Sequence, residues 1–305
     1  MKLHDNKERF VEAITATSAM FGIEPALVEK DYFVTLFLKK AVERVSGLVF
    51  KGGTSLSKCY NLIDRFSEDI DLTLDDQHFT QSQKRNSVKE LVAVCDELGL
   101  ELINKEAIEN HTHGNFNSYD IRYPIMFPSE DVKPELKVEM TYIQKCYPHE
   151  QRMATSYIGE FFAKNGNEHV VAEYELDAFG LQVQSLERTF VDKVFAICDY
   201  YLSGNAVRNS RHIYDISKLL TKVDIATSNL KSLVESVRNE RKPNKTCLSA
   251  QEGANVPEFL KQIVATGFYK QDYNETTSKL LTKMVSYDDA IESLQAVVES
   301  GLFEM

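Results

Sequence analysis

The chain has 305 residues, of which 43% are hydrophobic and 27% charged, and its formal net charge is −11. These proportions are typical of a soluble globular protein with room for two domains. They exclude a membrane-spanning chain, because no apolar run approaches the roughly 20 residues of a membrane helix. The negative charge also argues against broad, non-specific binding of a nucleic-acid duplex, which needs a basic surface.

The cysteine pattern and the N-terminus both indicate a cytoplasmic protein. The five cysteines are scattered, odd in number and form no Cys-x-x-Cys pair. Such usage suits reduced thiols and argues against a zinc site. The N-terminal stretch is polar and lacks the apolar core of a secretion signal, so we expect no secretion and no membrane partner.

The segment from about Asn6 to Val45 is predicted to form two helices. The break between them contains Gly22 and Pro25, and proline suits a first helical turn. In the second helix, apolar residues recur at helical spacing, and Gly47 follows its end.

A strand, a glycine turn and a helix are predicted next. Leu48 to Phe50 is a short apolar run, and Gly52-Gly53 follows it at once. Two glycines allow a sharp turn and the close approach of a ligand. Thr54 and Ser55 then stand where a helix would begin, as expected capping residues. The N–H groups of such a helix start are suited to bind phosphate.

The run Asp69-Ile70-Asp71-Leu72 predicts a strand with both carboxylates on one face. Neighbouring carboxylates repel each other, so this arrangement does not stabilise a strand. It can, however, bind a divalent cation. The alternative is an incidental pair of aspartates, but the adjacent glycine turn favours a functional one.

Further elements are predicted up to about Ile143. They are a helix with Val88, Leu91, Val92, Cys95 and Leu98 on one face, and strands over Ser118–Phe127 and Glu135–Ile143. Glu139 lies in the second strand between apolar neighbours, where it could supply a third carboxylate to a two-metal site. Alternatively, it points outward from an edge strand. His111 and His113 are interpreted as loop residues, because no further ligands lie near them in the sequence.

The second half of the chain is predicted to be mostly helical, with a soft boundary near Cys146 to Gln151 and a strand-like interlude from His169 to Val183. In the helix Leu186–Leu202, Lys193 lies at the far edge of the apolar stripe, where a surface lysine is the common outcome. Arg211 and Asp215 lie four apart in a later helix, where an intrahelical ion pair is the structural alternative. Asn239 to Val256 is predicted to be a long exposed loop. About three more helices are expected to end near Phe303.

The motifs together resemble a known family. KGGTSLSK at residues 51–58 and RFSEDIDL at residues 65–72 are similar to those of the AbiEii/AbiGii nucleotidyltransferase toxins, within the polymerase-beta superfamily. VEKDYFVT at residues 28–35, Lys137-Val138-Glu139, ERTFVDKVFA at residues 187–196 and Arg211-x-x-Tyr214-Asp215 resemble further motifs of this family. Where the family often has a basic residue, this chain has Tyr200, so Arg208 would have to take over that role.

The resemblance implies an α/β (α+β) fold. A catalytic domain at 1–150 would hold a small mixed sheet with flanking helices, and a mostly helical domain at 151–305 would complete the active-site cleft. For the early helix motif, packing is expected for Tyr32, and the nucleotide is an alternative partner for Lys30.

The resemblance also implies site residues. Asp69, Asp71 and Glu139 would bind two Mg²⁺ ions. Gly52, Gly53, Thr54, Ser55, Ser67, Lys193 and Arg211 would contact a nucleoside triphosphate, with Lys193 at the β- and γ-phosphates. Asp215 is the expected catalytic residue of the fourth motif, and His212 is the alternative.

The expected activity is nucleotidyl transfer to an acceptor hydroxyl, with an RNA end, tRNA above all, as acceptor. It would serve a toxin–antitoxin or phage-defence system with a cognate antitoxin. Cations expected near RNA are Lys51, Lys58, Arg65, Arg208, Arg211, Arg241, Lys242 and Lys245. The alternatives are a small-molecule or protein acceptor, phosphoryl transfer onto protein, and a nucleotide-binding regulatory module without turnover.

Overall fold

The computed structural model describes residues 2–65, 67, 69–75, 80–110, 114–130, 132–142 and 145–304, the side chains of residues 109 and 110 excepted. The chain forms two compact units. Unit 1 comprises residues 1–59, 68–146 and 150–183, and unit 2 comprises residues 60–67, 147–149 and 184–305. The expected loop residues His111 and His113 lie outside the described residues.

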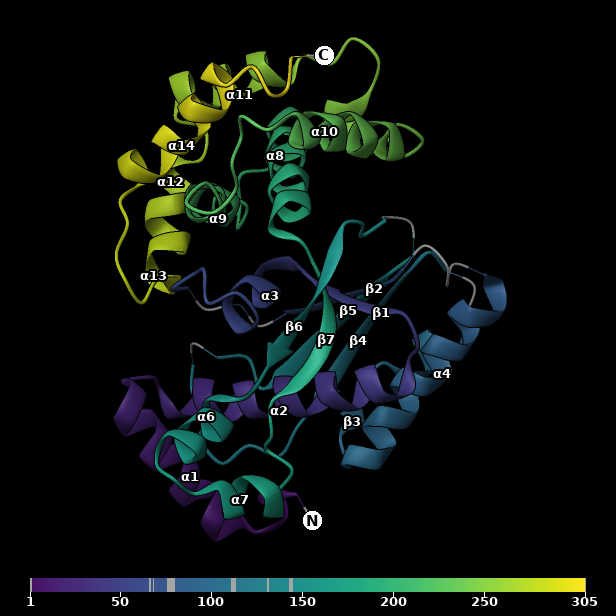
Figure 1. The fold of residues 1–305 in the computed structure, drawn as a ribbon, viewed down its shortest axis with the longest axis vertical. Coiled ribbons are helices and arrows are strands. Elements are labelled where there is room, and N and C mark those ends of the chain that lie inside the picture. The colour runs from purple at the N-terminus through teal and green to yellow at the C-terminus, as the bar shows by residue number, and fades with distance from the viewer. Residues whose placement is uncertain are drawn as a thin grey trace. The chain divides into compact units, whose positions relative to one another are not determined.

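Unit 1 begins with the two predicted helices, α1 (Lys7–Phe21) and α2 (Pro25–Arg44), after a short 3-10 turn, η1 (Leu3–Asp5). Gly22 ends α1 in the left-handed conformation, at φ 66°, and Pro25 opens α2. The apolar side of α2 is buried and packs against strand β5 and helix α4 (Figure 1). The other helices of unit 1 are α3 (Gly52–Lys58), α4 (Gln81–Leu98), α5 (Lys105–Asn110), α6 (Tyr157–Lys164) and α7 (Glu168–Glu173).

A mixed seven-stranded sheet forms the centre of unit 1, with the order β3-β4-β5-β2-β1-β7-β6. The strands β1 and β2 are antiparallel, whereas β5 runs parallel to β2 and β7 runs parallel to β1. This sheet and its helices confirm the expected fold class. The strands are β1 (Leu48–Lys51), β2 (Asp69–Leu74), β3 (Glu101–Leu102), β4 (Phe116–Arg122), β5 (Glu135–Thr141), β6 (His149–Ala154) and β7 (Phe179–Gln184).

The sheet continues further along the chain than the sequence suggests. β6 falls at the expected domain boundary, and the interlude from His169 to Val183 contains α7 before β7. Because β7 pairs with β1, at Val49↔Gln182 and Phe50↔Val183, residues 150–183 belong to unit 1. The division at 1–150 and 151–305 stays a prediction, while the compact units group residues 150–183 with the sheet, because a strand's place in a sheet depends on its distant partner.

Unit 2 is helical and has its own core. Its elements are α8 (Leu186–Leu202), α9 (Arg211–Leu219), α10 (Ser228–Arg241), η3 (Leu248–Ala250), α11 (Val256–Thr266), α12 (Lys270–Asp272), the π-helical η4 (Tyr273–Thr277), α13 (Ser278–Leu280) and α14 (Tyr287–Glu299). Near the C-terminus, Phe303 packs edge-on against Phe195 with a centroid distance of 5.6 Å.

No single helix of the described chain has the length and apolar character to cross a membrane. The pair α1 and α2 passes that test by length and composition when taken together, with a bend of 112° at the break.

Candidate functional site

The sheet of unit 1 brings three carboxylates to one face. On β2, Ile70 and Leu72 are fully buried, while Asp69 and Asp71 are half-buried on the opposite face. β5 lies beside β2, and its Glu139 is in register with Asp71. Residues in register on neighbouring strands point to the same side, so Glu139 joins the aspartate pair. β5 lies between β4 and β2, so Glu139 does not belong to an edge strand.

Gly52 is the point where the glycine turn meets this carboxylate group. An added Cβ at Gly52 would lie only 1.9 Å from Oδ2 of Asp71, and the residue has a φ of +78°. Both the space and the backbone conformation therefore require glycine here. The Asp71 carboxylate lies directly against the backbone at the start of α3.

The donor set fits Mg²⁺, which prefers carboxylate and phosphate oxygens. Within the described residues, however, no three acidic, histidine or cysteine side chains converge into a ready-made metal site. Glu139 instead forms an ion pair with Lys137 on the same strand. This contact raises the pKa of the Lys137 ammonium.

Thr54 and Ser55 do not cap α3, so that prediction is wrong. The helix begins at Gly52, directly after β1, and Lys51 occupies the N-cap position. Thr54 Oγ1 donates to the backbone oxygen of Asp69 at 2.6 Å, and Ser55 Oγ donates to that of Gly52 at 2.8 Å. Thr54 thereby ties α3 to the first residue of the aspartate strand. Gly53 and Ser67 are both half-buried.

Unit 2 contains a buried charge cluster at the expected third and fourth motifs. Lys193 is 6% exposed, so it is not a surface lysine, and its Nζ lies 2.6 Å from Oδ2 of Asp215. Asp215 is fully buried. Arg65 grips the same carboxylate with two bonds of 2.7 Å, from Nε to Oδ1 and from Nη2 to Oδ2. Burial opposes ionisation of Asp215, but Arg65 and Lys193 outweigh it and hold its pKa well below the usual value.

The intrahelical alternative for Asp215 is wrong, because its ion pairs come from other segments of unit 2. Arg211 is half-buried, and it forms no ion pair with Asp215 in the described part of the chain. The ring of His212 stacks on Tyr200 with a centroid distance of 5.7 Å. Its Nδ1 is buried with no hydrogen-bond partner among the described residues, and burial lowers the pKa of His212 well below its usual value.

The charged residues of the early helix motif form hydrogen bonds with backbone groups elsewhere in unit 1. Glu29 accepts hydrogen bonds from the backbone N–H groups of Met126 and Phe127, and Lys30 donates to the oxygen of Lys133. Lys30 is 1% exposed, so its observed role is to hold this loop. The packing role expected for Tyr32 is confirmed by its 2% exposure.

Several cations expected near RNA are buried in ion pairs. Besides Arg65, Lys58 is paired with Asp31 at 2.5 Å. Arg241 is the last residue of α10, where it pairs with Asp199 at 2.8 Å. The expected loop over Asn239 to Val256 therefore begins after α10 and contains the short helix η3. Arg208 is exposed, and its backbone N–H donates to Asp272.

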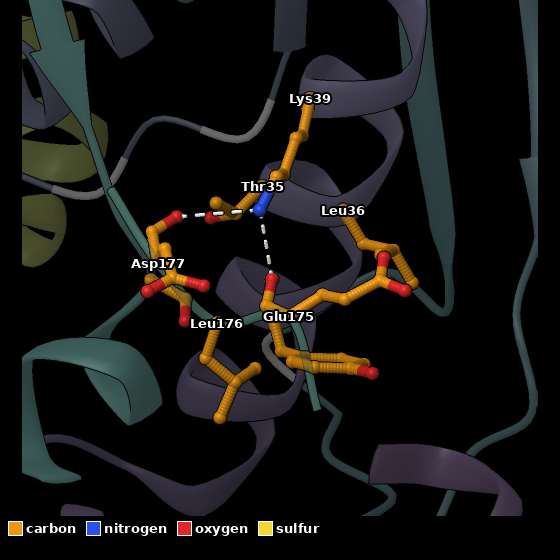
Figure 2. A pocket seen from close by; sticks show the side chains of 8 residues that line it. Thr35, Leu36, Lys39, Glu175, Leu176 and Asp177 are labelled. Carbon is orange, nitrogen blue, oxygen red and sulfur yellow. Dashed lines mark hydrogen bonds between the residues drawn. The ribbon is translucent and has the colours of Figure 1, made fainter. Parts of the chain in front are cut away.

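A small pocket also lies in unit 1, between α2 and the segment that joins α7 to β7 (Figure 2). Lys39 crosses it and donates to the backbone oxygens of Glu175 and Asp177, at 2.9 and 3.5 Å. None of the candidate metal or nucleotide residues lines this pocket.

The comparison with known families agrees with this set of motifs. The family described as "Nucleotidyl transferase AbiEii toxin, Type IV TA system" matches residues 37–298. The chain belongs to the AbiEii family. It is therefore a nucleotidyltransferase toxin of a type IV toxin–antitoxin system, with a nucleoside triphosphate as substrate and a cognate antitoxin. Family membership excludes a regulatory module without turnover and confirms the resemblance seen in the sequence.

A solved structure has a similar fold. MenT4, a nucleotidyltransferase toxin from Mycobacterium tuberculosis H37Rv, superposes on this AbiEii-family chain with a TM-score of 0.59 at 17% sequence identity. The match covers 92% of this chain and 85% of MenT4. No curated relative matches the chain.

Proposed function

We propose that this AbiEii-family enzyme uses Mg²⁺ to transfer a nucleotide from a nucleoside triphosphate to an RNA end, with tRNA as the acceptor. The single observation that supports the metal step is the group of Asp69, Asp71 and Glu139 on one face of β2 and β5, with Asp71 packed on Gly52. In this proposal, transfer arrests growth and serves phage defence, and the antitoxin restrains it.

In the proposed mechanism, Asp69 and Asp71 would hold two Mg²⁺ ions, and Glu139 would supply the third carboxylate. When bound, Mg²⁺ would stabilise charge on the phosphates and activate the acceptor hydroxyl. Gly53, Thr54 and Ser67 bind the triphosphate. Lys193 offsets charge on the β- and γ-phosphates as the bond to the α-phosphate breaks, and pyrophosphate leaves.

The decisive experiment incubates the protein with each triphosphate, labelled at the α-phosphate, together with total RNA and either Mg²⁺ or EDTA. We expect one RNA class to take up label only with Mg²⁺, and Asp71→Asn to abolish the uptake. Asp71→Asn keeps the size of the side chain against Gly52, so loss of activity reports the lost charge. Glu135→Gln on β5 is the matched control for Glu139→Gln, because both residues lie on the same strand face.

A second candidate acceptor is a small molecule or a protein. It is favoured by the burial of Lys58, Arg65 and Arg241, which leaves fewer cations for RNA phosphates on a chain of charge −11. Transfer without labelled RNA, but with a labelled metabolite or polypeptide, would support it. A fully active Asp71→Asn protein would contradict the metal mechanism for either acceptor.

A further inference from the structure

The turn that leads into α9 has a strained backbone. Arg208 has a φ of 62°, in the left-handed region that glycine adopts readily and that residues with a Cβ avoid. The side chain of Arg208 is exposed, so its own burial does not offset this strain. Strained residues persist only where their surroundings hold them, and they cluster at functional sites.

Asp272, the last residue of α12, holds this turn. Its Oδ1 accepts from the backbone N–H of Arg208 at 2.8 Å, and its Oδ2 accepts from the N–H and the hydroxyl of Ser210 at 3.2 and 2.6 Å. Hydrogen bonds to an ionised acceptor are roughly twice as strong as neutral ones. Ser210 is the N-cap residue of α9, so the Asp272 carboxylate also lies at the positive end of the helix dipole. Both oxygens of one carboxylate therefore stabilise one turn.

The segment that carries Asp272 is anchored to α8, the helix that contains Lys193. Tyr269 is fully buried, and its Oη donates to the backbone oxygen of Ile197 at 2.6 Å. Ile197 follows Lys193 by four residues, about one helical turn. This hydrogen bond therefore links the chain just before Asp272 to the part of α8 next to Lys193.

The π-helical η4 provides a second contact with the start of α9. Hydrogen bonds of a π-helix join residues five apart. Asp272 and Thr277 have this spacing, and both reach Ser210, because Thr277 Oγ1 lies 2.7 Å from Ser210 Oγ. Ser210 and Thr277 are fully buried. Residues 269–277 therefore fix the start of α9 relative to α8.

Arg211 is the residue that this arrangement places. It is the first residue of α9, directly after Ser210, and it is half-buried. Burial is the main reason that the pKa of Lys193 is lowered, and the positive charge of Arg211 adds to the effect. The Arg211 guanidinium thus lies within electrostatic reach of Lys193 in the same unit. Two such cations repel each other, and a bound polyanion relieves the repulsion.

We propose that Asp272 is a positioning residue that holds Arg208 in its left-handed conformation and thereby places Arg211, together with Lys193, to bind the triphosphate. The inference rests on the proposed roles of Arg211 and Lys193 in binding the triphosphate. Without the carboxylate, the backbone at Arg208 relaxes toward an ordinary conformation. The direction of the chain into α9 then changes, and Arg211 leaves its place.

Asp272 also stabilises the fold at the start of α9, and its charge distinguishes the two roles. A carboxylate near a phosphate site repels anions. If Asp272 acted only through its charge, removing that charge would strengthen the binding of a polyphosphate. Loss of positioning weakens it.

The experiment titrates the full-length protein with inorganic tripolyphosphate at a fixed excess of Mg²⁺, by calorimetry. This probe has no base and cannot transfer a nucleotide. Asp272→Asn keeps the size of the side chain and removes its charge and one acceptor oxygen. The change is measured in three backgrounds, which are wild type, Arg208→Gly and Arg211→Gln, and urea unfolding reports the folding of each variant.

The matched control is Asn255→Ala, which removes the side-chain cap of α11 in the same unit. This variant should lose stability, because the N–H of Glu258 loses its acceptor, and it should bind tripolyphosphate as the wild type does.

We expect Asp272→Asn to weaken tripolyphosphate binding by about tenfold or more in the wild-type background. In the Arg208→Gly background the same change should weaken it by no more than about twofold, because glycine adopts the left-handed conformation without support. In the Arg211→Gln background it should also have little effect, because the residue that Asp272 positions is already lost. A merely structural role predicts equal losses in all three backgrounds.

The inference alone is overturned by unchanged or tighter binding in a folded Asp272→Asn protein, or by equal weakening in the wild-type background and either of the others. If Asp272→Asn unfolds, the Asp272→Asn/Arg208→Gly protein carries the test. Binding within about twofold of Arg208→Gly then supports the inference, and unfolding of this double variant as well overturns it.

The proposed triphosphate site has a separate outcome. If the wild type does not bind tripolyphosphate, or if Arg211→Gln binds it as the wild type does, the triphosphate role of Arg211 is wrong. The positioning role of Asp272 is then wrong too.

Discussion

Gly52 lies against the Asp71 carboxylate, so adding a single methyl group at Gly52 tests this contact. Gly52→Ala would place a Cβ 1.9 Å from the Asp71 carboxylate and put alanine at a φ of +78°. The conformation costs about 1–2 kcal/mol of folding stability. Because Asp71 is a proposed metal ligand, its displacement should in addition lower transfer on the order of 10- to 100-fold, the usual effect of disturbing the support of such a ligand.

The matched control is Gly22→Ala in the same unit. Gly22 has a φ of +66°, and no described atom outside its own turn lies within 4 Å of where an added Cβ would stand. The control variant should lose similar stability in a urea titration and keep full activity. Equal activity of the two variants would show that the Gly52–Asp71 contact has no part in transfer.

His212 gives a prediction about pH. Its folded pKa lies below the ordinary 6.5, so acid protonates the unfolded chain first and favours unfolding. Stability should therefore fall as pH drops from 7 to 5, by at most about 1.4 kcal/mol per pH unit for this one group. His212→Phe keeps a ring to stack on Tyr200 and cannot titrate, so the difference between wild type and variant in urea unfolding should grow toward pH 5. A difference that stays constant with pH would refute it.

Residues of helix α2 bind the end of helix α3 and hold it in place. Asp31 accepts from Lys58 Nζ with Oδ1 and from the Tyr157 N–H with Oδ2, while Lys58 also donates to Thr35 Oγ1 at 2.6 Å. Lys58 is the last residue of α3. The buried pair therefore fixes the end of α3 opposite the Gly52 contact with Asp71.

Lys58→Met should destabilise the protein by about 3–5 kcal/mol, because it leaves Asp31 as an uncompensated, largely buried charge. Adding Asp31→Asn should recover part of this loss. The control is Lys164→Met, which removes an exposed partner of Glu160 and should change stability by at most about 0.5 kcal/mol. Thermal melting of the three variants measures this order, and similar melting of Lys58→Met and Lys164→Met would contradict it.

For the whole molecule, the proposed RNA acceptor must be reconciled with a net charge of −11. Lys242 and Lys245 are exposed, whereas Arg241 is held by Asp199 and lies 3.6 Å from Asp192. Of the three cations in this expected basic cluster, the two lysines are therefore the ones placed to meet phosphates. Arg241→Ala should instead reduce stability, since it removes the partner of a largely buried carboxylate.

Replacing Lys242 and Lys245 with alanine should weaken RNA binding and reduce its salt slope by up to about two units, one for each phosphate that no longer meets a lysine. Triphosphate affinity should not change. Lys231 and Lys279, also exposed in unit 2, provide a control pair with the same change in charge. RNA affinity measured against salt concentration tests this, and identical salt slopes for both pairs would place the RNA surface elsewhere.

The sequence by itself determined the features that depend on near neighbours. Helical periodicity located α1, α2, α4 and α8, and alternation in residues 69–72 put two carboxylates on one strand face. The family resemblance also follows from these local motifs. Periodicity failed at β6, because an edge strand of mixed polarity carries no clear alternation.

Only the tertiary structure decided which distant residues meet. Arg65 and Asp215 are 150 positions apart, and the register of Glu139 with Asp71 depends on the pairing of β5 with β2. The spacing within α9 suggested Arg211 as the partner of Asp215, yet Arg65 and Lys193 take that place. The same holds for Lys58 and Arg241, whose charge is visible in the sequence but whose burial is not. Local pattern specifies an element and its faces, whereas long-range packing selects the partner of each charge, and that choice separates cations that hold the fold from those free to bind a phosphate.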